Sequence, residues 1–202
     1  MAIITNYATL KTAVADYLAR DDLTTFIPNF VQNTENKLHR TLNLRNEETG
    51  MSLAVSSGQA LVPSKFKALK FAYKDGSPAQ LLQWVPIEDL YREYPVRTNS
   101  GTPIKISREA GNFVFGPAPS DFTLKGVYYA EQDPLETTDS SWYVTNAPEV
   151  LLYGSLMEAA LFIRDVNMFQ FWKPQFDEAV STLKRENDNA ETSFGALEVR
   201  SA

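Results

Sequence analysis

The apolar residues of this chain change their spacing twice, and this change restricts the possible folds more than any other feature. They recur every three to four residues up to about residue 46, and every second residue from about 47 to 130. From about residue 148 the three-to-four spacing returns. The first spacing is that of an amphipathic helix and the second that of a half-buried strand. The chain is therefore expected to run from helices to strands and back to helices.

The first 46 residues are expected to form two helices that pack as a hairpin. Their predicted apolar stripes are Leu10, Val14, Tyr17 and Leu18 in the first helix and Ile27, Val31, Thr34, Leu38 and Leu42 in the second. Thr5 or Asn6 is a suitable cap for the first helix. The second is expected to start near Thr24, so that Pro28 falls in its first turn.

Between residues 47 and 135 the alternation predicts about six short strands joined by hairpin turns. The sequence Asp75-Gly76-Ser77-Pro78 is the clearest turn signal. A short helix from Pro86 to Tyr94 is expected to interrupt the strands. Successive hairpins predict an antiparallel β lobe, either a small sheet or a sandwich.

Residues 136–188 are assigned to the C-terminal helices, with helical spacing from about Pro148. Within it, Gly154-Ser155 is expected to mark close helix packing. Pro174 is expected to kink the last helix or to begin it anew. After Asn187 the chain is polar, and residues 189–202 are expected to form a flexible tail.

These patterns predict an α+β fold. The N-terminal helical hairpin (1–46) and the C-terminal helices (136–188) are expected to pack as a helical bundle. The antiparallel β lobe (47–135) is inserted between them, and residues 189–202 follow as the tail.

The composition excludes several classes of site. The chain has no cysteine and one histidine, His39, which rules out disulfides, thiolate nucleophiles, zinc fingers and any zinc site with two histidines from one chain. The formal net charge of −6 with 19 basic residues disfavours a general nucleic-acid binder. No apolar run approaches the roughly 18 residues of a membrane span, so no membrane contact is expected.

No catalytic site, metal or cofactor is expected, because no nucleotide-binding or nucleophile-elbow motif is present. Glu47 and Glu48 are adjacent, so on a strand they would point to opposite faces. A hydrolase built from Glu47 or Glu48 with Asp133 is a third hypothesis, and it requires two carboxyls within about 10 Å in one cleft.

Two further groups of charged residues have ordinary structural explanations. Asp133, Glu136 and Asp139 lack the glycine and the spacing of a calcium loop, which favours a solvated loop. His39 stands beside Lys37 and Arg40, which favours a surface or interface position over the role of a base.

Aromatic and basic residues suggest two binding hypotheses. Trp84, Tyr91 and Tyr94 cluster near the short helix and would suit a sugar platform, although core and interface packing explain them at least as well. A carbohydrate-binding β module of a phage tail or secreted protein is therefore the alternative function. The lysines from Lys65 to Lys74 alternate with aromatics, a pattern found in nucleic-acid binding but also on the outer face of a strand. Contact of this stripe, or of His39, with DNA stays open.

A set of landmarks is distributed along most of the chain, from about Tyr7 to Leu183. In order, they are Asp21-Asp22-Leu23, Ile27-Pro28-Asn29-Phe30, Leu42-Asn43-Leu44-Arg45, Leu61-Val62-Pro63 with Phe66 and Leu69, Gly101-x-Pro103, Phe113-x-Phe115-x-Pro117-x-Pro119, Tyr128-Tyr129, Leu135, Trp142, and Leu152-Tyr153-Gly154-x-Leu156-x-x-Ala159-Ala160. This ordered set resembles the head-to-tail adaptor (connector) proteins of tailed bacteriophages. Lys65 stands where that family has an acidic residue, and Lys105 where it has an aromatic one.

The resemblance implies a non-enzymatic structural protein of the virion. Such adaptors form a ring, usually of twelve copies, under the portal, where they extend the DNA channel and dock tail or nozzle proteins. Packaged DNA passes through without sequence recognition. The implied location is the head–tail junction, with the host cytoplasm during assembly.

The resemblance also implies a role for the C-terminal segment, which in this family often reaches onto the portal. Here that segment is residues 189–202. Its portal-binding anchors would be Phe194, Leu197 and Val199.

Overall fold

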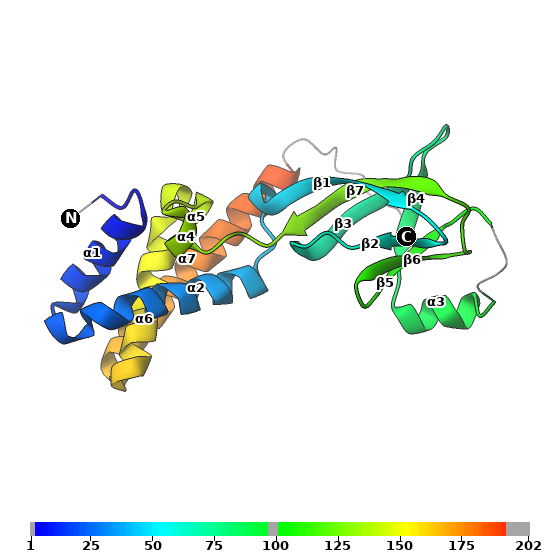
Figure 1. Cartoon of the computed structure of the whole chain (residues 1–202). Helices are drawn as coiled ribbons and strands as arrows, with labels where there is room; N and C mark the ends of the chain where they lie inside the picture. The colour runs from blue at the N-terminus through cyan, green and yellow to red at the C-terminus, as the bar shows by residue number, and fades with distance from the viewer. Residues whose placement is uncertain (1–2, 97–100, 193–202) are drawn as a thin grey trace, which may run out of the picture. The chain divides into compact units, whose positions relative to one another are not determined.

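A computed structural model of the chain describes residues 3–96 and 101–192. The chain divides into two compact units, one made of residues 1–46 with 132–202 and the other of residues 47–131. We call them the helical unit and the β unit, and Figure 1 labels their elements. Helices and a seven-stranded sheet occur together, which confirms the predicted α+β class. Within the described residues, no helix is both long and apolar enough to cross a bilayer.

The helical unit is organised around one apolar helix, α6 (Pro148–Ile163). Its other elements are α1 (Tyr7–Leu18), η1 (a 3₁₀ helix, Asp21–Phe26), α2 (Ile27–Thr41), α4 (Leu135–Thr138), α5 (Trp142–Asn146) and α7 (Val166–Thr192). Helix α6 contacts α1, α2, α5 and α7. Its buried residues are therefore distributed around the helix, as a central position requires.

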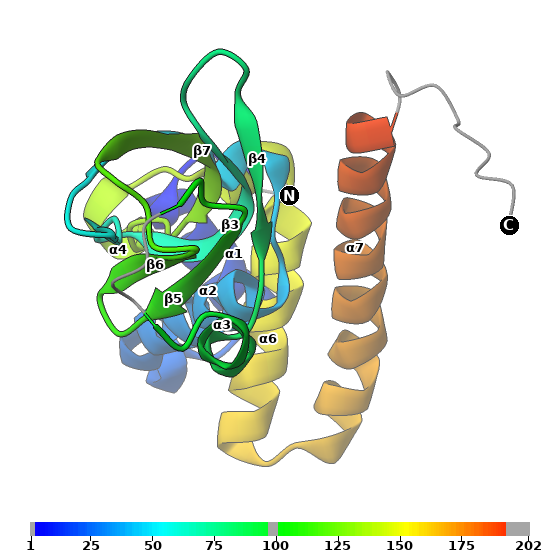
Figure 2. The same ribbon diagram turned by 90° about the vertical axis from the view of Figure 1, so that its right-hand side faces the viewer.

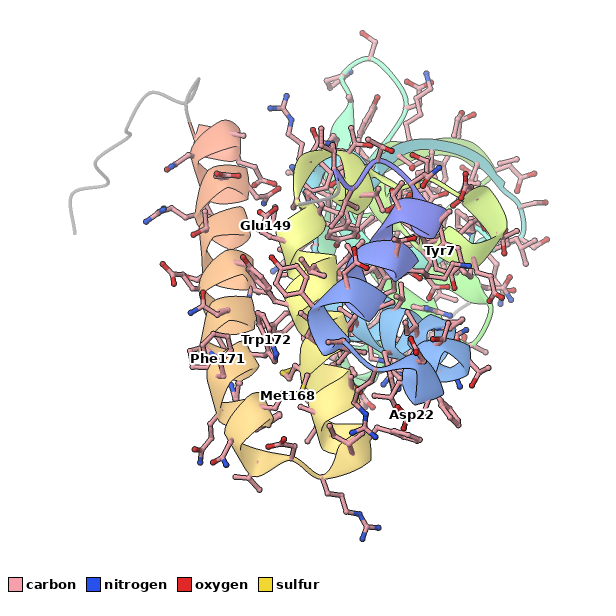
Figure 3. All side chains as sticks on the ribbon, turned by 90° about the vertical axis from the view of Figure 1, so that its left-hand side faces the viewer. Tyr7, Asp22, Glu149, Met168, Phe171 and Trp172 are labelled. Atoms are coloured by element: carbon pink, nitrogen blue, oxygen red, sulfur yellow. The ribbon has the colours of Figure 1, made fainter. Side chains whose placement is uncertain are left out.

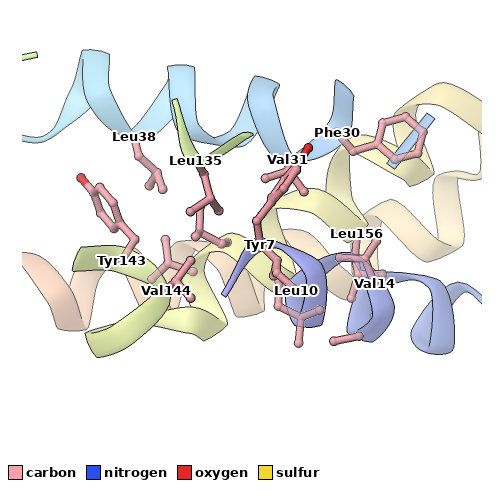
Figure 4. Close-up of a cluster of buried hydrophobic side chains, with 14 of the residues drawn as sticks. Tyr7, Leu10, Val14, Phe30, Val31, Leu38, Leu135, Tyr143, Val144 and Leu156 are labelled. Carbon is pink, nitrogen blue, oxygen red and sulfur yellow. The ribbon is translucent and has the colours of Figure 1, made fainter. Parts of the chain in front are cut away.

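The core of the helical unit joins side chains from both ends of the sequence (Figure 4). Leu10 and Val14 of α1, Val31 and Leu38 of α2, and Leu156 of α6 are all at most 1% exposed. Because these positions follow the three-to-four spacing of the sequence, each helix turns its apolar stripe toward the same core.

The second predicted helix starts later than expected. Residues Asp21–Phe26 form the 3₁₀ helix η1, and the α-helix begins at Ile27 rather than near Thr24. Pro28 has no N–H to donate to the carbonyl of Thr24, which disfavours an α-helical start at Thr24. Pro28 therefore lies in the first turn of α2, where its missing donor costs little.

Helix α7 decides between the two expectations for Pro174 only in part, and it shortens the expected tail. It runs without interruption from Val166 to Thr192, so Pro174 lies inside it and begins no new helix. Figure 2 shows α7 beside α6, and packing on α6 stabilises the helix despite the missing proline N–H. The helix also includes residues 189–192, which the sequence pattern assigns to the flexible tail.

The β unit is one sheet that curls back on itself. Its strands are β1 (Glu48–Val55), β2 (Gln59–Leu61), β3 (Phe66–Lys74), β4 (Gln80–Trp84), β5 (Lys105–Glu109), β6 (Asn112–Gly116) and β7 (Phe122–Ala130), with η2 (Arg45–Glu47) before β1 and α3 (Ile87–Glu93) after β4. The strand order is β1-β7-β3-β4-β5-β6-β2. The two outer strands are consecutive in the chain and are linked by a bridge between Ser56 and Gln59. The sheet thus wraps around a core that includes Ile106, Phe113 and Phe115.

The expectation of a purely antiparallel lobe was wrong at one strand pair. Strands β4 and β5 are parallel, with Gln83 opposite Lys105 and Trp84 opposite Ile106. The helix α3 lies between them in the chain, and such a connection lets the second strand run in the same direction as the first. The other strand pairs in the described sheet are antiparallel.

Candidate interaction surfaces

Glu47 and Glu48 form ion pairs inside the β unit. Glu47 is 1% exposed, and its Oε2 lies 2.8 Å from Nζ of Lys67. Oε1 of Glu48, at the start of β1, lies 2.6 Å from Nζ of Lys70. Each carboxylate is thus paired with a lysine of β3. The hydrolase hypothesis receives no support from this geometry.

The same ion pairs explain part of the lysine stripe. Lys67 and Lys70 have acidic partners within the β unit, and Nζ of Lys74 lies 5.8 Å from the ring centroid of Phe122. These three lysines therefore stabilise the sheet that carries them. This favours the structural interpretation of the stripe over a nucleic-acid contact.

The acidic stretch before α5 has no metal-site geometry. Asp133, Glu136 and Asp139 are all exposed, and α4 forms between the first and the last of them. Among the residues that the structure describes, no three histidine, aspartate or glutamate side chains converge as a metal site would require.

His39 packs against an aromatic ring. It is half-buried on α2, and its ring centroid lies 6.0 Å from that of Tyr143 on α5. The structure therefore places His39 at a contact between two helices of the same unit.

Glu35 is a buried acid that the sequence analysis missed. It is 5% exposed, and its Oε1 and Oε2 lie 3.1 and 3.3 Å from the N–H of Leu135, which donates to them at the start of α4. Burial raises the pKa of Glu35 to about 7, although the hydrogen bond from Leu135 acts in the opposite direction. Glu35 follows Val31 by four residues, so helical spacing alone indicated that it shares the buried face of α2.

The three aromatics proposed as a sugar platform have separate partners in the β unit. Trp84 packs edge-on against Phe113, and the Tyr91 hydroxyl donates to Oε2 of Glu109 at 2.9 Å. Tyr94 lies so close to Gly116 that a Cβ there would come within 2.5 Å of its ring. These contacts favour a packing role.

An exposed apolar patch surrounds the turn between α6 and α7. Leu161, Phe162 and Val166 are 48%, 52% and 64% exposed, and Phe26 is 38% exposed. The rings of Phe26 and Phe162 are 4.7 Å apart between centroids, so residues from distant parts of the chain share this surface. We call these four residues the turn patch. A cluster of large apolar side chains in contact with water is typical of a site that binds another protein.

The apolar surface continues along the first part of α7. Phe171 is 62% exposed, whereas the adjacent Trp172 packs against Tyr17 of α1 and Tyr153 of α6, both at 5.7 Å between ring centroids. Figure 3 shows Trp172 and Phe171 on α7 beside α6. The Trp172 ring therefore packs α7 against α1 and α6, whereas the Phe171 ring is accessible to a partner.

A pocket of about 420 Å³ lies near the C-terminal end of α7. Its lining residues are Leu44, Arg45, Asn46, Trp142, Leu183, Glu186, Asn187 and Ala190. The predicted anchors Phe194, Leu197 and Val199 lie outside the described residues, so their positions relative to this pocket are not given by the structure.

Comparison with known proteins identifies the family. No curated protein gives a match to the chain. A family model described as SU10 adaptor protein matches residues 5–200, which is nearly the whole sequence. The fold and the exposed apolar surfaces agree with a protein that binds other proteins, and the match agrees with the order of landmarks in the sequence. The chain belongs to the SU10 adaptor protein family of bacteriophage head-to-tail adaptors.

Proposed function

We propose that this chain is a non-enzymatic structural protein that forms a ring of twelve copies at the head–tail junction of the virion. The turn patch is the observation that carries this proposal beyond family membership. Phe26, Leu161, Phe162 and Val166 present large apolar side chains to water, and a partner surface would remove them from it. The ring would assemble in the host cytoplasm, without any membrane contact.

A ring of identical subunits needs two different surfaces that meet head to tail. The β unit supplies a second apolar surface, because Phe71 and Leu81 are 42% and 65% exposed and both neighbour Tyr73 on the paired strands β3 and β4. It differs in composition and in backbone from the turn patch. Two unlike apolar surfaces on one chain support a closed ring over a symmetric dimer.

The charge distribution supports a channel through which DNA moves freely. The helical unit has 16 acidic and 10 basic residues, and the β unit has nine of each. A protein without excess positive charge does not retain the phosphate backbone. We infer that packaged DNA passes through the ring without sequence recognition.

In this proposal the ring contacts the portal on one side and a tail or nozzle protein on the other. Phe194, Leu197 and Val199 are the proposed portal-binding anchors, in a polar segment that can become ordered on a partner.

Cosedimentation with the portal ring of the same virus tests the proposal. We expect the wild-type protein to comigrate with the portal, with a copy number that matches the portal symmetry. Phe162→Ser combined with Val166→Ser should weaken ring formation or portal binding by at least about tenfold, whereas Gln170→Ser, at an exposed position of α7, should not. A folded wild-type protein that neither forms rings nor comigrates with the portal would overturn the proposal.

A further inference from the structure

Two hydrogen bonds join residues that line the 420 Å³ pocket. The backbone N–H of Arg45 donates to Oδ1 of Asn187 at 2.8 Å, and Nη1 of Arg45 donates to the carbonyl of Ala190 at 3.4 Å. These bonds hold the segment after α2 against the last turns of α7. The pocket wall is therefore fixed by hydrogen bonds that an occupant does not need to replace.

The remaining lining includes Asn46 and Glu186 together with large apolar side chains. Leu44 and Leu183 form part of the lining, and the indole of Trp142 is 37% exposed. An aromatic side chain that covered this surface would bury apolar area from both partners. The volume of about 420 Å³ is sufficient for one aromatic side chain with part of its backbone.

The residues of α7 that line the pocket follow a helical spacing that the sequence continues. Leu183, Asn187 and Ala190 are separated by four and three residues, as one face of a helix requires. The next positions in this series are Phe194 and Leu197, again four and three residues apart. The side chains that would come next on this face are thus large and apolar.

The segment after α7 also begins next to the pocket. Ala190 lines the pocket, and the described helix ends two residues later, at Thr192. Phe194 follows Ala190 by four residues, a separation of about 6 Å along a continued helix and at most about 14 Å in an extended chain. Such a short tether gives Phe194 a high effective concentration at the pocket.

We propose that the pocket binds the Phe194 side chain of the same chain, and that Leu197 covers its rim. Val199 does not share this face and makes no contact in the proposal. One consequence rests on the proposed function: the portal would have to withdraw Phe194 and Leu197 from the pocket before it could bind them. A subunit outside the virion would then keep its portal anchors covered.

Disulfide trapping tests the docking directly. The chain has no cysteine, so Asn46→Cys at the pocket and Ser193→Cys beside Phe194 create a single possible bridge. We expect this pair to oxidise within one chain, and we expect Phe194→Ser to slow the oxidation about tenfold. Val199→Ser in the same background is the matched control and should leave the rate unchanged.

Hydrogen exchange of the full chain without cysteines gives a second measurement. Phe194→Ser should accelerate exchange about tenfold in the last two turns of α7, whereas Val199→Ser should not. Equal oxidation rates for the two serine variants, or a bridge that joins two chains, would overturn the proposal. Both measurements use the isolated protein. A protein that passes them but does not bind the portal would therefore refute the proposed function and leave the docking intact.

Discussion

The carboxyl of Glu35 makes the stability of the helical unit depend on pH. Burial raises its pKa from the ordinary 4.5 to about 7. The folded chain therefore binds this proton more tightly than the unfolded chain, and the proton stabilises the fold. This stabilisation is complete below about pH 4.5 and is lost as the pH rises through 7.

The Glu35→Gln variant keeps an oxygen that can accept the N–H of Leu135 and removes the titration. We expect it to unfold at a higher urea concentration than the wild type at pH 8, with a gain of at most roughly 3 kcal/mol, and to match the wild type near pH 4.5. Urea unfolding of both proteins across this range measures the difference. A difference that does not change with pH would refute the assignment.

Gly154 lies where helices of the helical unit approach each other closely. A Cβ at this position would lie 2.3 Å from Cγ2 of the fully buried Thr34 and 2.9 Å from the ring of Phe176. Gly154→Ala should therefore separate α6 from α2 and α7 and destabilise the protein by about 1–3 kcal/mol, even though alanine favours a helix. Thermal unfolding of both variants measures the effect. Gly50→Ala is the control, because a Cβ at that position would have no heavy atom within 4 Å. Equal melting temperatures for the two variants would contradict the packing argument.

Single residues differ in how far their roles could be predicted. The close packing at Gly154 was predictable, because a glycine among large apolar residues leaves room for another helix. The lysine partners of Glu47 and Glu48 could not be predicted, since Lys67 and Lys70 are 20 and 22 residues away in the chain. Such pairs follow from strand register, which local patterns do not specify.

At the scale of single elements, α7 contains a residue that weakens it. Pro174 cannot donate to the carbonyl of Gln170, yet the helix continues on both sides. Pro174→Ala should restore this hydrogen bond and stabilise the protein by about 1–3 kcal/mol, reduced by the extra freedom of the unfolded chain. Thermal unfolding of Pro174→Ala measures the effect. Gln175→Ala, at the exposed neighbouring position, is the control. Loss of stability in Pro174→Ala would mean that the proline has a packing role.

The type of each element was easier to predict than its partner. Spacing alone predicted helices around Leu10, Val31 and Leu156 and strands around Leu69 and Tyr128, and the structure confirms these elements. The parallel pairing of β4 with β5 was missed, because the direction of a strand depends on the whole connection before it. The sequence left open whether the last helix continues through Pro174 or begins anew there, because the packing on α6 that stabilises it is not visible in a local pattern.

At the scale of the whole molecule, each unit has its own core. Phe113 is fully buried in the core of the β unit, and Leu156 is fully buried in the core of the helical unit. Phe113→Ala leaves a cavity and should cost about 3–5 kcal/mol. We expect faster hydrogen exchange across residues 47–96 and 101–131 and little change in α1, α2 and α6. Equal acceleration in both units would show that they unfold as one.

The division into units also determines when each one can be completed during synthesis. The helical unit is made of two segments separated by the 85 residues of the β unit. At translation rates of about 5–20 residues per second, Val31 leaves the ribosome roughly 6–25 seconds before Leu156, against which its helix must pack. The β unit is continuous and has no such delay. During this interval α1 and α2 expose their apolar stripes on the nascent chain, so chaperones that bind such stripes have a defined time in which to act on this protein.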